Sequence, residues 1–298
     1  MAKIVQCVPN FSEGKDKMLI ERIIDEIRKV EGTKLLDYSM DKDHNRCVVT
    51  FIGTPEAVEE AAFNACKKAS ELIDMSKHKG EHPRMGATDV IPLIPISEVT
   101  MEECVEMSRR LGKRIGEELG ISVFLYEKSA SAPHRENLAS IRKGQYEGMN
   151  EKMKDEKWKP DFGPDTLNVK SGATAVGARM PLVAFNVNLD TNNLEIANKI
   201  ARSVRGRSGG FTACKALGVE IKERGIVQVT MNMVDYNSTP LYRVFDMIER
   251  EAKRYGVNII GSEIVGLVPM MALINCADYY LRLENFREDQ ILEKRIYE

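Results

Sequence analysis

The amino-acid sequence predicts an α+β protein made of two ferredoxin-like subdomains, each with the element order βαββαβ. Three observations lead to this fold class. The chain has 298 residues, the usual length of two domains. Hydrophobic residues make up 43% and charged residues 30% of it, the balance of a globular protein with a buried core. Strand-like and helix-like apolar patterns follow one another in the same order in both halves.

The first half begins with a β-branched run that Pro9 ends, and apolar residues at helical spacing follow it. Thr54 and Pro55 form a typical helix start, a capping residue before a proline in the first helical position. The elements expected here, in the order strand, helix, strand, strand, helix, strand, are residues 3–8, 16–30, 33–38, 46–52, 54–75 and 89–94. A helix over about 100–118 and a strand over 121–126 come after them.

The second half repeats this order in its pattern of apolar residues, though not in residue identity. Asn192 or Asn193 caps its first helix, and Pro240 starts its second. The elements expected, in the same order, are residues 182–189, 192–204, 214–221, 226–233, 240–254 and 257–265. We therefore divide the chain into an N-terminal subdomain over 1–178 and a C-terminal subdomain over 179–298.

The segment between the two patterns, about residues 143–180, has a different character. It starts charged and helical and then becomes rich in glycine and proline, which disfavours regular structure. A plain linker and a ligand-facing loop both fit this composition. Ligand sites are common where domains meet, which favours the loop.

Charge and cysteine content exclude several classes of protein. With 43 Lys and Arg against 45 Asp and Glu, the net charge of −2 argues against binding to nucleic acid or to an anionic membrane. No apolar run is long enough for a transmembrane helix, and the N-terminus does not resemble a signal peptide. The six cysteines are scattered, so we expect reduced thiols and a cytoplasmic protein.

The densest group of polar residues is SKHKGEHPRMGATD, residues 76–89. It contains His78 and His82, and a histidine that titrates near neutral pH can transfer a proton in either direction. Its other ionisable residues are Lys77, Lys79, Glu81, Arg84 and Asp89. The cations would lower the pKa of a neighbouring histidine and attract an anionic substrate. A solvated charged loop is the alternative interpretation.

Three other motifs fail on their context. HKGEH at 78–82 matches an inverted zinc-protease pattern, but Gly80 and Pro83 disfavour the helix that this pattern needs, so we expect no metal. GRSGG at 206–210 matches a nucleophile elbow but follows a helix where a strand is required. GATAVGAR at 172–179 resembles a phosphate-binding loop without its Lys-Ser/Thr pair. As a glycine-rich loop it would still bring backbone amides close to a ligand, and Arg179 could hold an anion.

Three further features are candidates for a binding site. Five cations without an intervening acid occur between residues 196 and 219, which fits either an anion site or a solvated helix face. Asn10, at the end of the first strand, could face a site. Arg46 belongs to the turn sequence DHNR at 43–46, where His44 could line the site or lie at the surface.

These segments together resemble the formiminotransferase domain family. The motifs that carry the resemblance run in order through nearly the whole chain: CVPNFSEG at 7–14, DHNR-x-V-x-TF at 43–51, LIDM-x-KHKGEHPRMGA at 72–87, PDFGP at 160–164, GA-x-x-x-GAR at 172–179, AFN-x-NL at 184–189 and VGLVP at 265–269. HKGEHPRMGA is long and chemically unusual, so chance similarity is a poor explanation.

The resemblance implies an activity and a site. The family transfers the formimino group of N-formimino-L-glutamate to nitrogen-5 of tetrahydrofolate, in histidine degradation and one-carbon metabolism. It has a folate-binding tunnel between its subdomains, forms homodimers and uses tetrahydrofolate as co-substrate. The catalytic histidine falls on His82. The folate-contacting segment falls on Gly163, Pro164, Asp165, Thr166, Leu167, Asn168, Val169, Lys170, Ser171 and Gly172. With these we group Asn10, Arg46, Lys79, Arg84 and Arg179 as substrate-binding candidates.

Two departures and two alternatives remain. Many relatives are fused to a cyclodeaminase, so we expect a separate cyclodeaminase to act on the product. Some relatives carry an acid where this chain has Ser39, two residues after Asp37; if that acid orients the histidine in them, another group must do so here. The alternatives are an N-formylglutamate:tetrahydrofolate formyltransferase of the same fold and a folate-binding protein without turnover.

Overall fold

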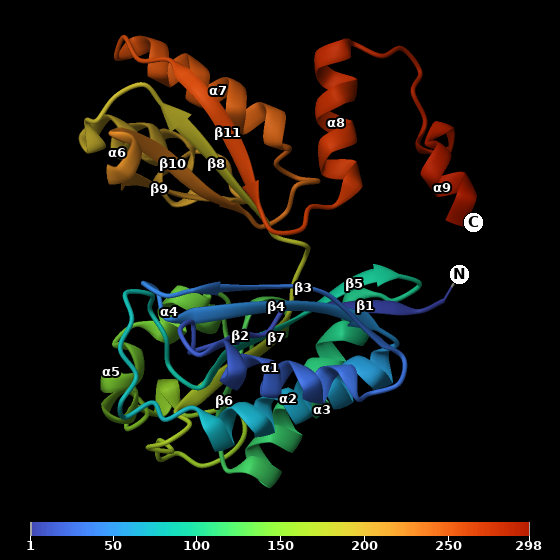
Figure 1. Cartoon of the computed structure of the whole chain (residues 1–298), viewed down its shortest axis with the longest axis vertical. Coiled ribbons are helices and arrows are strands. Elements are labelled where there is room, and N and C mark those ends of the chain that lie inside the picture. Colours follow the sequence, from blue (N-terminus) through green and yellow to red (C-terminus); the bar gives the residue numbers. More distant parts are fainter. Residues whose placement is uncertain (1, 298) are drawn as a thin grey trace. The chain divides into compact units, whose positions relative to one another are not determined.

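The computed structural model describes residues 2–297, and the chain divides into two compact units after Arg179 (Figure 1). Each unit contains one β-sheet and several helices. The predicted fold class is therefore confirmed as mixed α+β with two sheets in two subdomains.

The first unit contains one mixed sheet of seven strands. Its elements are β1 Ile4–Cys7, β2 Asn10–Phe11, α1 Lys17–Arg28, β3 Thr33–Asp41, β4 Arg46–Gly53, α2 Pro55–Leu72, β5 Thr88–Ser97, α3 Met101–Leu119, β6 Ser122–Leu125, α4 Leu138–Arg142, α5 Gln145–Lys152 and β7 Ala173–Ala178. β1 and β2 both lie between β4 and β5, as two pieces of one interrupted strand. Pro9, which has no N–H for the ladder, lies at the interruption.

Three helices of the first unit lie on the same side of its sheet, as Figure 1 shows for α1, α2 and α3. Each begins at a side-chain cap, where Asp16, Thr54 and Thr100 accept the N–H of the residue three positions on. The apolar stripe of α1, Ile20, Ile23, Ile24 and Ile27, is fully buried in the core. Other segments of this unit can therefore pack against the opposite face of the sheet.

The structure corrects one local prediction in this unit. Residues 172–179 are not a glycine-rich loop, because residues 173–178 form β7, a strand that lies parallel to β5 and β6 and between them. All six residues of β7 are buried. Small residues suit this position because Gly177 lies against Tyr126, where a Cβ would be 2.3 Å from the carbonyl oxygen. The motif is an interior strand, and its backbone amides pair with neighbouring strands.

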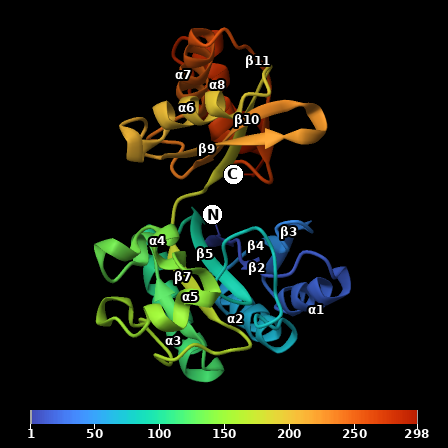
Figure 2. The ribbon, with the colours of Figure 1, turned by 90° about the vertical axis from the view of Figure 1, so that its left-hand side faces the viewer.

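The second unit has an antiparallel sheet of four strands in the order β11-β8-β10-β9. Its elements are β8 Val183–Leu189, α6 Leu194–Val204, β9 Cys214–Ile221, β10 Ile226–Met233, α7 Leu241–Arg254, β11 Ile259–Val265, α8 Met270–Leu281 and α9 Leu292–Tyr297. Figure 2 shows α6 and α7 on the same side of β9 and β10. Their apolar residues, such as Ile200 and Ile248, pack against Val187 and Val229 of the sheet.

The C-terminal helices were not among the predicted elements. α8 has the sequence MMALINCADYYL, in which apolar residues occupy every side of the helix. A segment that is apolar on every side shows no helical periodicity. The sequence pattern therefore does not distinguish this helix from a strand or a loop. Among residues 2–297, no helix has the length and apolar character needed to cross a membrane.

Candidate active site

His82 lies in an irregular segment between α2 and β5 that passes close to the turn between β3 and β4. Gly80 allows this approach, because a Cβ on it would be 2.3 Å from the carbonyl oxygen of His44. Asn45 ties the segments together: its side chain accepts from Gly14 N at 2.9 Å and donates to Lys79 O at 2.9 Å. His82 is therefore held by contacts from three loops of one subdomain. Lys79 itself is exposed.

Two contacts of Nδ1 indicate which nitrogen of the His82 ring carries the proton. Its Nδ1 is 2.6 Å from the carbonyl oxygen of Pro83 and 3.0 Å from Nη1 of Arg46. A carbonyl oxygen can only accept and a guanidinium can only donate, so Nδ1 cannot hydrogen-bond both. The shorter contact assigns the proton to Nδ1, which donates to Pro83. The other ring nitrogen, Nε2, then carries the lone pair of a base.

His82 is neutral at physiological pH. Burial, followed by the charges of Arg46 and Arg142, lowers the pKa of His82 from its usual 6.5 to about 4, and these effects outweigh the opposing charge of Asp89. A neutral imidazole with a free Nε2 can accept a proton in the first half of a reaction and return it in the second.

A fully buried carboxylate, Asp89, organises the charges beside this histidine. It accepts from Arg46 Nη1 at 2.8 Å, from Arg142 through Nε and Nη2, and from Met85 N at 3.0 Å. Burial alone would raise the pKa of Asp89, but Arg142 and Arg46 hold it below its usual range. Two arginines share one carboxylate, so the cluster has a surplus positive charge that favours an anionic ligand.

Asn10 fixes Arg46 from the other side. Its Oδ1 accepts from Nε of Arg46 at 3.0 Å and from Nη2 at 2.6 Å, while its Nδ2 donates to Val8 O at 2.8 Å. Asn10 is the first residue of β2, directly after the interruption at Pro9. The broken strand thus turns an amide side chain toward the guanidinium.

His78 and Arg84 form a separate, internal network. Arg84 is 6% exposed and donates to both oxygens of Glu147, at 2.8 and 2.6 Å, and to Gln145 at 3.0 Å. His78 donates through Nε2 to Asn45 O at 2.9 Å and accepts at Nδ1 from Arg84 Nε at 3.2 Å. Burial lowers the pKa of His78, which fits this neutral tautomer. Both side chains thus hold the loop in shape, and Arg84 has few N–H groups left for a substrate.

His44 lies beside His82, with 6.0 Å between the ring centroids and an edge-to-face arrangement. Its Nδ1 is 2.8 Å from Oδ2 of Asp41. Asp41 is thus the acid that contacts His44, while Ser39 is an exposed residue of β3. His134 lies elsewhere, against Trp158 with a centroid distance of 4.8 Å.

Residues 163–172 pack against α3 at one end and against the segment that carries His82 at the other. Gly163 packs on Gly116 of α3, and Pro164 O accepts from Ser122 Oγ at 2.7 Å. Asn168 accepts from Lys170 N and Ser171 N, forming a tight turn, and Ser171 O accepts from Ala87 N at 2.8 Å. Asp165, Thr166 and Val169 are exposed, while Leu167 is half-buried. Gly172, at a φ of +70°, lies against Met85, so this segment borders the one that carries His82.

The structure brings Asn10, Arg46 and His82 together with two groups outside the predicted site residues. Asp89 lies in the polar segment 76–89, but its sequence context alone indicates no role for it. Arg142, in the last turn of α4, was missed because a single arginine in a charged stretch gives no signal of its own. Arg179 lies at the end of β7, beside the buried hydroxyl of Tyr126. The cations between 196 and 219 belong to the second unit, where Lys199 pairs with Glu195 at 3.0 Å.

Residues 78–82 do not form the helix that the zinc pattern requires. In the described part of the chain, no three side chains of His, Cys, Asp or Glu gather in a way that could hold a metal ion.

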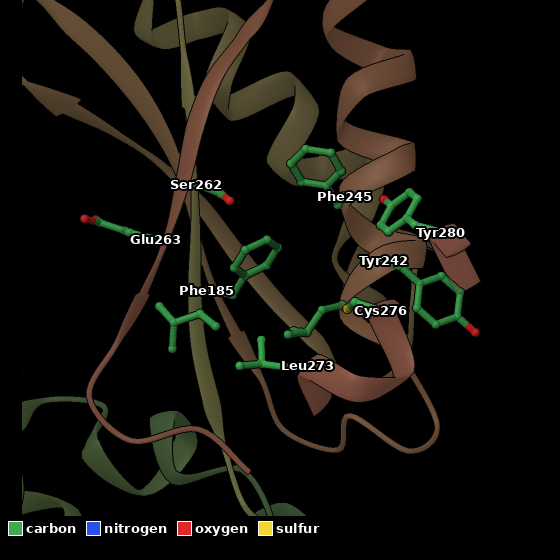
Figure 3. A pocket seen from close by; sticks show the side chains of 10 residues that line it. Phe185, Tyr242, Phe245, Ser262, Glu263, Leu273, Cys276 and Tyr280 are labelled. Atoms are coloured by element: carbon green, nitrogen blue, oxygen red, sulfur yellow. The ribbon is translucent and has the colours of Figure 1, made fainter. Parts of the chain in front are cut away.

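The second unit contains an open pocket of about 410 Å³ between β11, α7 and α8 (Figure 3). Most of its lining is apolar or aromatic and includes Phe185, Phe245, Leu273 and Tyr280. None of the predicted site residues lines it.

The chain has a two-subdomain α+β fold with a buried charge cluster beside a neutral histidine. Its sequence matches two family models. Residues 4–179 match the N-terminal subdomain of the formiminotransferase domain, and residues 184–296 match the formiminotransferase domain model. The chain belongs to the formiminotransferase domain family.

Full-length relatives are close in sequence. The chain is 55% identical over 99% of its length to a glutamate formimidoyltransferase of Streptococcus pyogenes, covering 99% of that protein. It is 50% identical over 98% of its length to one of Thermoplasma acidophilum, covering 97% of that protein. A formimidoyltransferase-cyclodeaminase of Dictyostelium discoideum is 46% identical, and the chain covers 56% of it.

Proposed function

We propose that this chain is a glutamate formimidoyltransferase that moves the formimino group of N-formimino-L-glutamate to nitrogen-5 of tetrahydrofolate. Two full-length relatives at 55% and 50% identity carry this activity in their names. The observation that carries the mechanism is the neutral His82, whose Nδ1 donates to Pro83 O and leaves Nε2 free. A residue in this state is a proton acceptor at physiological pH.

The reaction needs one proton to be moved between two nitrogens. Nitrogen-5 attacks the formimino carbon and forms a tetrahedral intermediate, and the attacking nitrogen must then lose its proton. His82 Nε2 takes that proton and returns it to the departing glutamate nitrogen, so that the C–N bond to glutamate breaks. Proton transfer by a positioned group contributes about 10²–10⁴ in rate. Holding both substrates close together in the correct orientation contributes much of the remaining rate acceleration.

The surplus positive charge at Arg46 and Arg142 supports the choice of substrate. N-formimino-L-glutamate and the polyglutamate tail of folate are both anionic, and guanidinium groups bind carboxylates through paired hydrogen bonds. A bound carboxylate would also offset the field that lowers the pKa of His82 and so raise this pKa toward neutrality. Substrate binding would thus make His82 a stronger base for the step in which it takes the proton from nitrogen-5.

Several finer parts of the proposal rest on the family resemblance. We place the folate at residues 163–172, in a tunnel between two ferredoxin-like subdomains, with Asn10, Arg46, Lys79 and Arg179 as binding residues. Arg84 acts through the loop that it supports. Tetrahydrofolate is the co-substrate, and the reaction as written involves no metal. The active form is a cytoplasmic homodimer, and a separate cyclodeaminase receives the product.

His82→Ala tests the catalytic assignment. Formation of 5-formiminotetrahydrofolate should fall by at least about 10²-fold, since a general base is lost. Binding of 5-formyltetrahydrofolate, measured by calorimetry, should change little. His134→Ala, in the same subdomain but against Trp158, is the matched control and should keep its activity. A His82→Ala protein with wild-type turnover would overturn the assignment.

The choice of donor needs its own assay. N-formimino-L-glutamate and N-formyl-L-glutamate are offered separately with tetrahydrofolate, and we expect faster turnover with the formimino donor. Faster turnover with the formyl donor would make the chain a formyltransferase. Binding of folate without turnover of either donor would make it a folate-binding protein.

A further inference from the structure

The last turn of α4 needs hydrogen-bond partners from elsewhere in the chain. This helix has only five residues, and Lys143 leaves the helical conformation directly after it, at a ψ of 123°. The last carbonyl groups of a helix have no N–H partner within it. Arg142, which donates to Asp89 through Nε and Nη2, is the final residue of α4. Its position therefore depends on what binds the carbonyl groups around it.

Lys152, the last residue of α5, binds these carbonyl groups. Its Nζ donates to Ser140 O at 2.5 Å, to Ile141 O at 2.7 Å and to Lys143 O at 3.3 Å. The three acceptors lie on both sides of Arg142 in the sequence. An ammonium group has three N–H donors, so this arrangement uses all of them.

The indole ring of Trp158 holds the ammonium group in this position. Lys152 Nζ lies 3.9 Å from the centroid of the ring, a cation–π contact that only the charged form makes. His134 packs edge-to-face against the same ring, with 4.8 Å between the centroids. The side chain of Lys152 is thus fixed between the end of α4 and an aromatic ring.

Lys152 loses its charge at a lower pH than an ordinary lysine does. Burial, followed by the charge of Lys143, lowers the pKa of Lys152 from 10.5 to about 8. The acids near it in the sequence have other partners: Glu151 pairs with Lys154, Asp155 accepts from Lys157 N, and Glu156 pairs with Lys159. A neutral amine has two N–H donors and a lone pair, and that lone pair would face the third carbonyl oxygen. The observed contacts therefore require the charged form.

We propose that Lys152 is a positioning residue of the active site, whose ammonium group holds the end of α4 so that Arg142 stays bound to Asp89 beside His82. Arg142 carries the effect, because its charge lowers the pKa of His82 and adds to the surplus positive charge beside it. Loss of the Lys152 proton should therefore loosen Arg142 and weaken binding of the anionic donor. The effect on donor binding rests on the proposed function, whereas the effect on the pKa of His82 does not.

A double-mutant cycle of Lys152→Met and Arg142→Met tests whether Lys152 acts through Arg142. The pKa of His82, from NMR titration, and the KM for N-formimino-L-glutamate are measured in each protein. Lys152→Met should raise the pKa of His82 and should raise the KM by about three- to tenfold, the upper figure being the loss of the whole Arg142 hydrogen bond. In the Arg142→Met background, Lys152→Met should change the KM by less than about twofold, because its effect is already lost. Lys154→Met, which removes an exposed lysine paired with Glu151, is the matched control and should leave both quantities at their wild-type values.

The pH dependence of the KM tests the role of the proton. In the wild-type protein the KM for N-formimino-L-glutamate should rise at alkaline pH, with a midpoint near pH 8. Lys152→Arg should show no such rise, because a guanidinium stays charged throughout this range. Arg142→Met should show none either, because the group that Lys152 holds is absent.

Four outcomes overturn the inference: wild-type values of both quantities in Lys152→Met, additive effects in the double variant, a wild-type KM that stays constant through the alkaline range, and an equal alkaline rise in Lys152→Arg or Arg142→Met. If Lys152→Met does not fold, the pH comparison of wild type with Arg142→Met decides, since it needs no change at Lys152. Wild-type protein that does not transfer the formimino group contradicts the proposed function itself. The cycle on the pKa of His82 still tests this inference in that case.

Discussion

At the scale of single residues, the site depends on an imbalance of charge around one buried carboxylate. Asp89 is fully buried and accepts from both Arg46 and Arg142, and Arg46 also touches the His82 ring. Burial lowers the pKa of His82 most, and the same two cations lower it further and leave positive charge for a ligand. In the proposed mechanism, the base and the anion site therefore depend on the same two arginines.

Arg142→Met tests this sharing. Removing a cation should raise the pKa of His82 from about 4 toward its usual value, measured by NMR titration of the imidazole. The KM for N-formimino-L-glutamate should rise by about tenfold, the effect of losing one charge-assisted hydrogen bond. Arg109→Met, which removes an exposed ion pair with Glu106, should change neither quantity. An unaltered His82 pKa in Arg142→Met would refute the shared role.

The low pKa of His82 also makes stability depend on pH. Between pH 4 and 6.5 the unfolded chain binds a proton that the folded site does not, so the free energy of unfolding should rise with pH across this window. His78, whose pKa is also lowered, adds to the same slope. In His82→Asn the slope should be smaller, as urea unfolding at several pH values would show. Equal slopes in the two proteins would mean that His82 is not protected from protonation.

Part of this site could be predicted and part could not. His82, Asn10 and Arg46 stand in distinctive motifs, so their residue types were informative. Arg142 binds Asp89, which lies 53 residues earlier in the sequence, and only the folded structure brings the two side chains together. Arg84 looked like a substrate ligand in sequence, yet its neighbours Glu147 and Gln145 come from α5 and take up its donors.

At the scale of elements, close packing and hydrogen bonds position two segments that belong to the proposed site, the predicted folate segment and the last turn of α4. Gly116 of α3 touches Gly163, the first residue of the predicted folate segment, and a Cβ on Gly116 would be 2.5 Å from Gly163 N. Lys152 donates to Ser140 O and Ile141 O at 2.5 and 2.7 Å and so fixes the last turn of α4, which carries Arg142. Two closely packed glycines and one lysine thus help to fix the positions of these two segments.

A comparison of Gly116→Ala with Gly148→Ala separates the effect of packing on stability from the effect of helix propensity. Both glycines are in helices, and alanine there favours the helix by about 0.5–1 kcal/mol. At Gly148 a Cβ meets nothing within 4 Å, so the variant should be as stable as wild type or slightly more stable. At Gly116 the overlap with Gly163 should cost about 1–3 kcal/mol and weaken 5-formyltetrahydrofolate binding. Equal melting temperatures for the two variants would contradict this account.

Most elements were predictable because their periods are clear, as in the isoleucine stripe of α1 or the strict alternation of β10. β7 was not, since Ala173, Ala175 and Gly177 give no strand signal. These residues form a strand only because β5 and β6 pair with them on both sides. α8 was missed for the opposite reason, an excess of apolar residues without a period.

At the scale of the whole molecule, apolar surface remains on the C-terminal helices. Leu281 is 67%, Leu292 69% and Ile296 65% exposed, and Tyr279 and Tyr280 lie on α8 as well. Exposed large apolar side chains that gather on a surface often mark interfaces. Their number on α8 and α9 agrees with the proposed homodimer.

Light scattering of the purified chain should give about twice the mass of one 33.6 kDa chain. Leu281→Glu should lower that mass toward the monomer, because a carboxylate at a dry interface is costly. Met18→Glu, which changes an 80% exposed residue of α1, should remain dimeric. A monomeric wild-type protein would contradict the proposal.

The central place of β7 has a consequence for how the chain is made. β5 and β6 leave the ribosome well before residues 173–178, yet they become neighbours of one continuous sheet only when β7 enters between them. Until then the nascent chain carries two unpaired strand edges that face each other across a gap, and such edges invite pairing with other chains. The first subdomain therefore cannot complete its core during synthesis until its last strand is translated. A fragment that stops before residue 173 should aggregate where one that includes β7 folds.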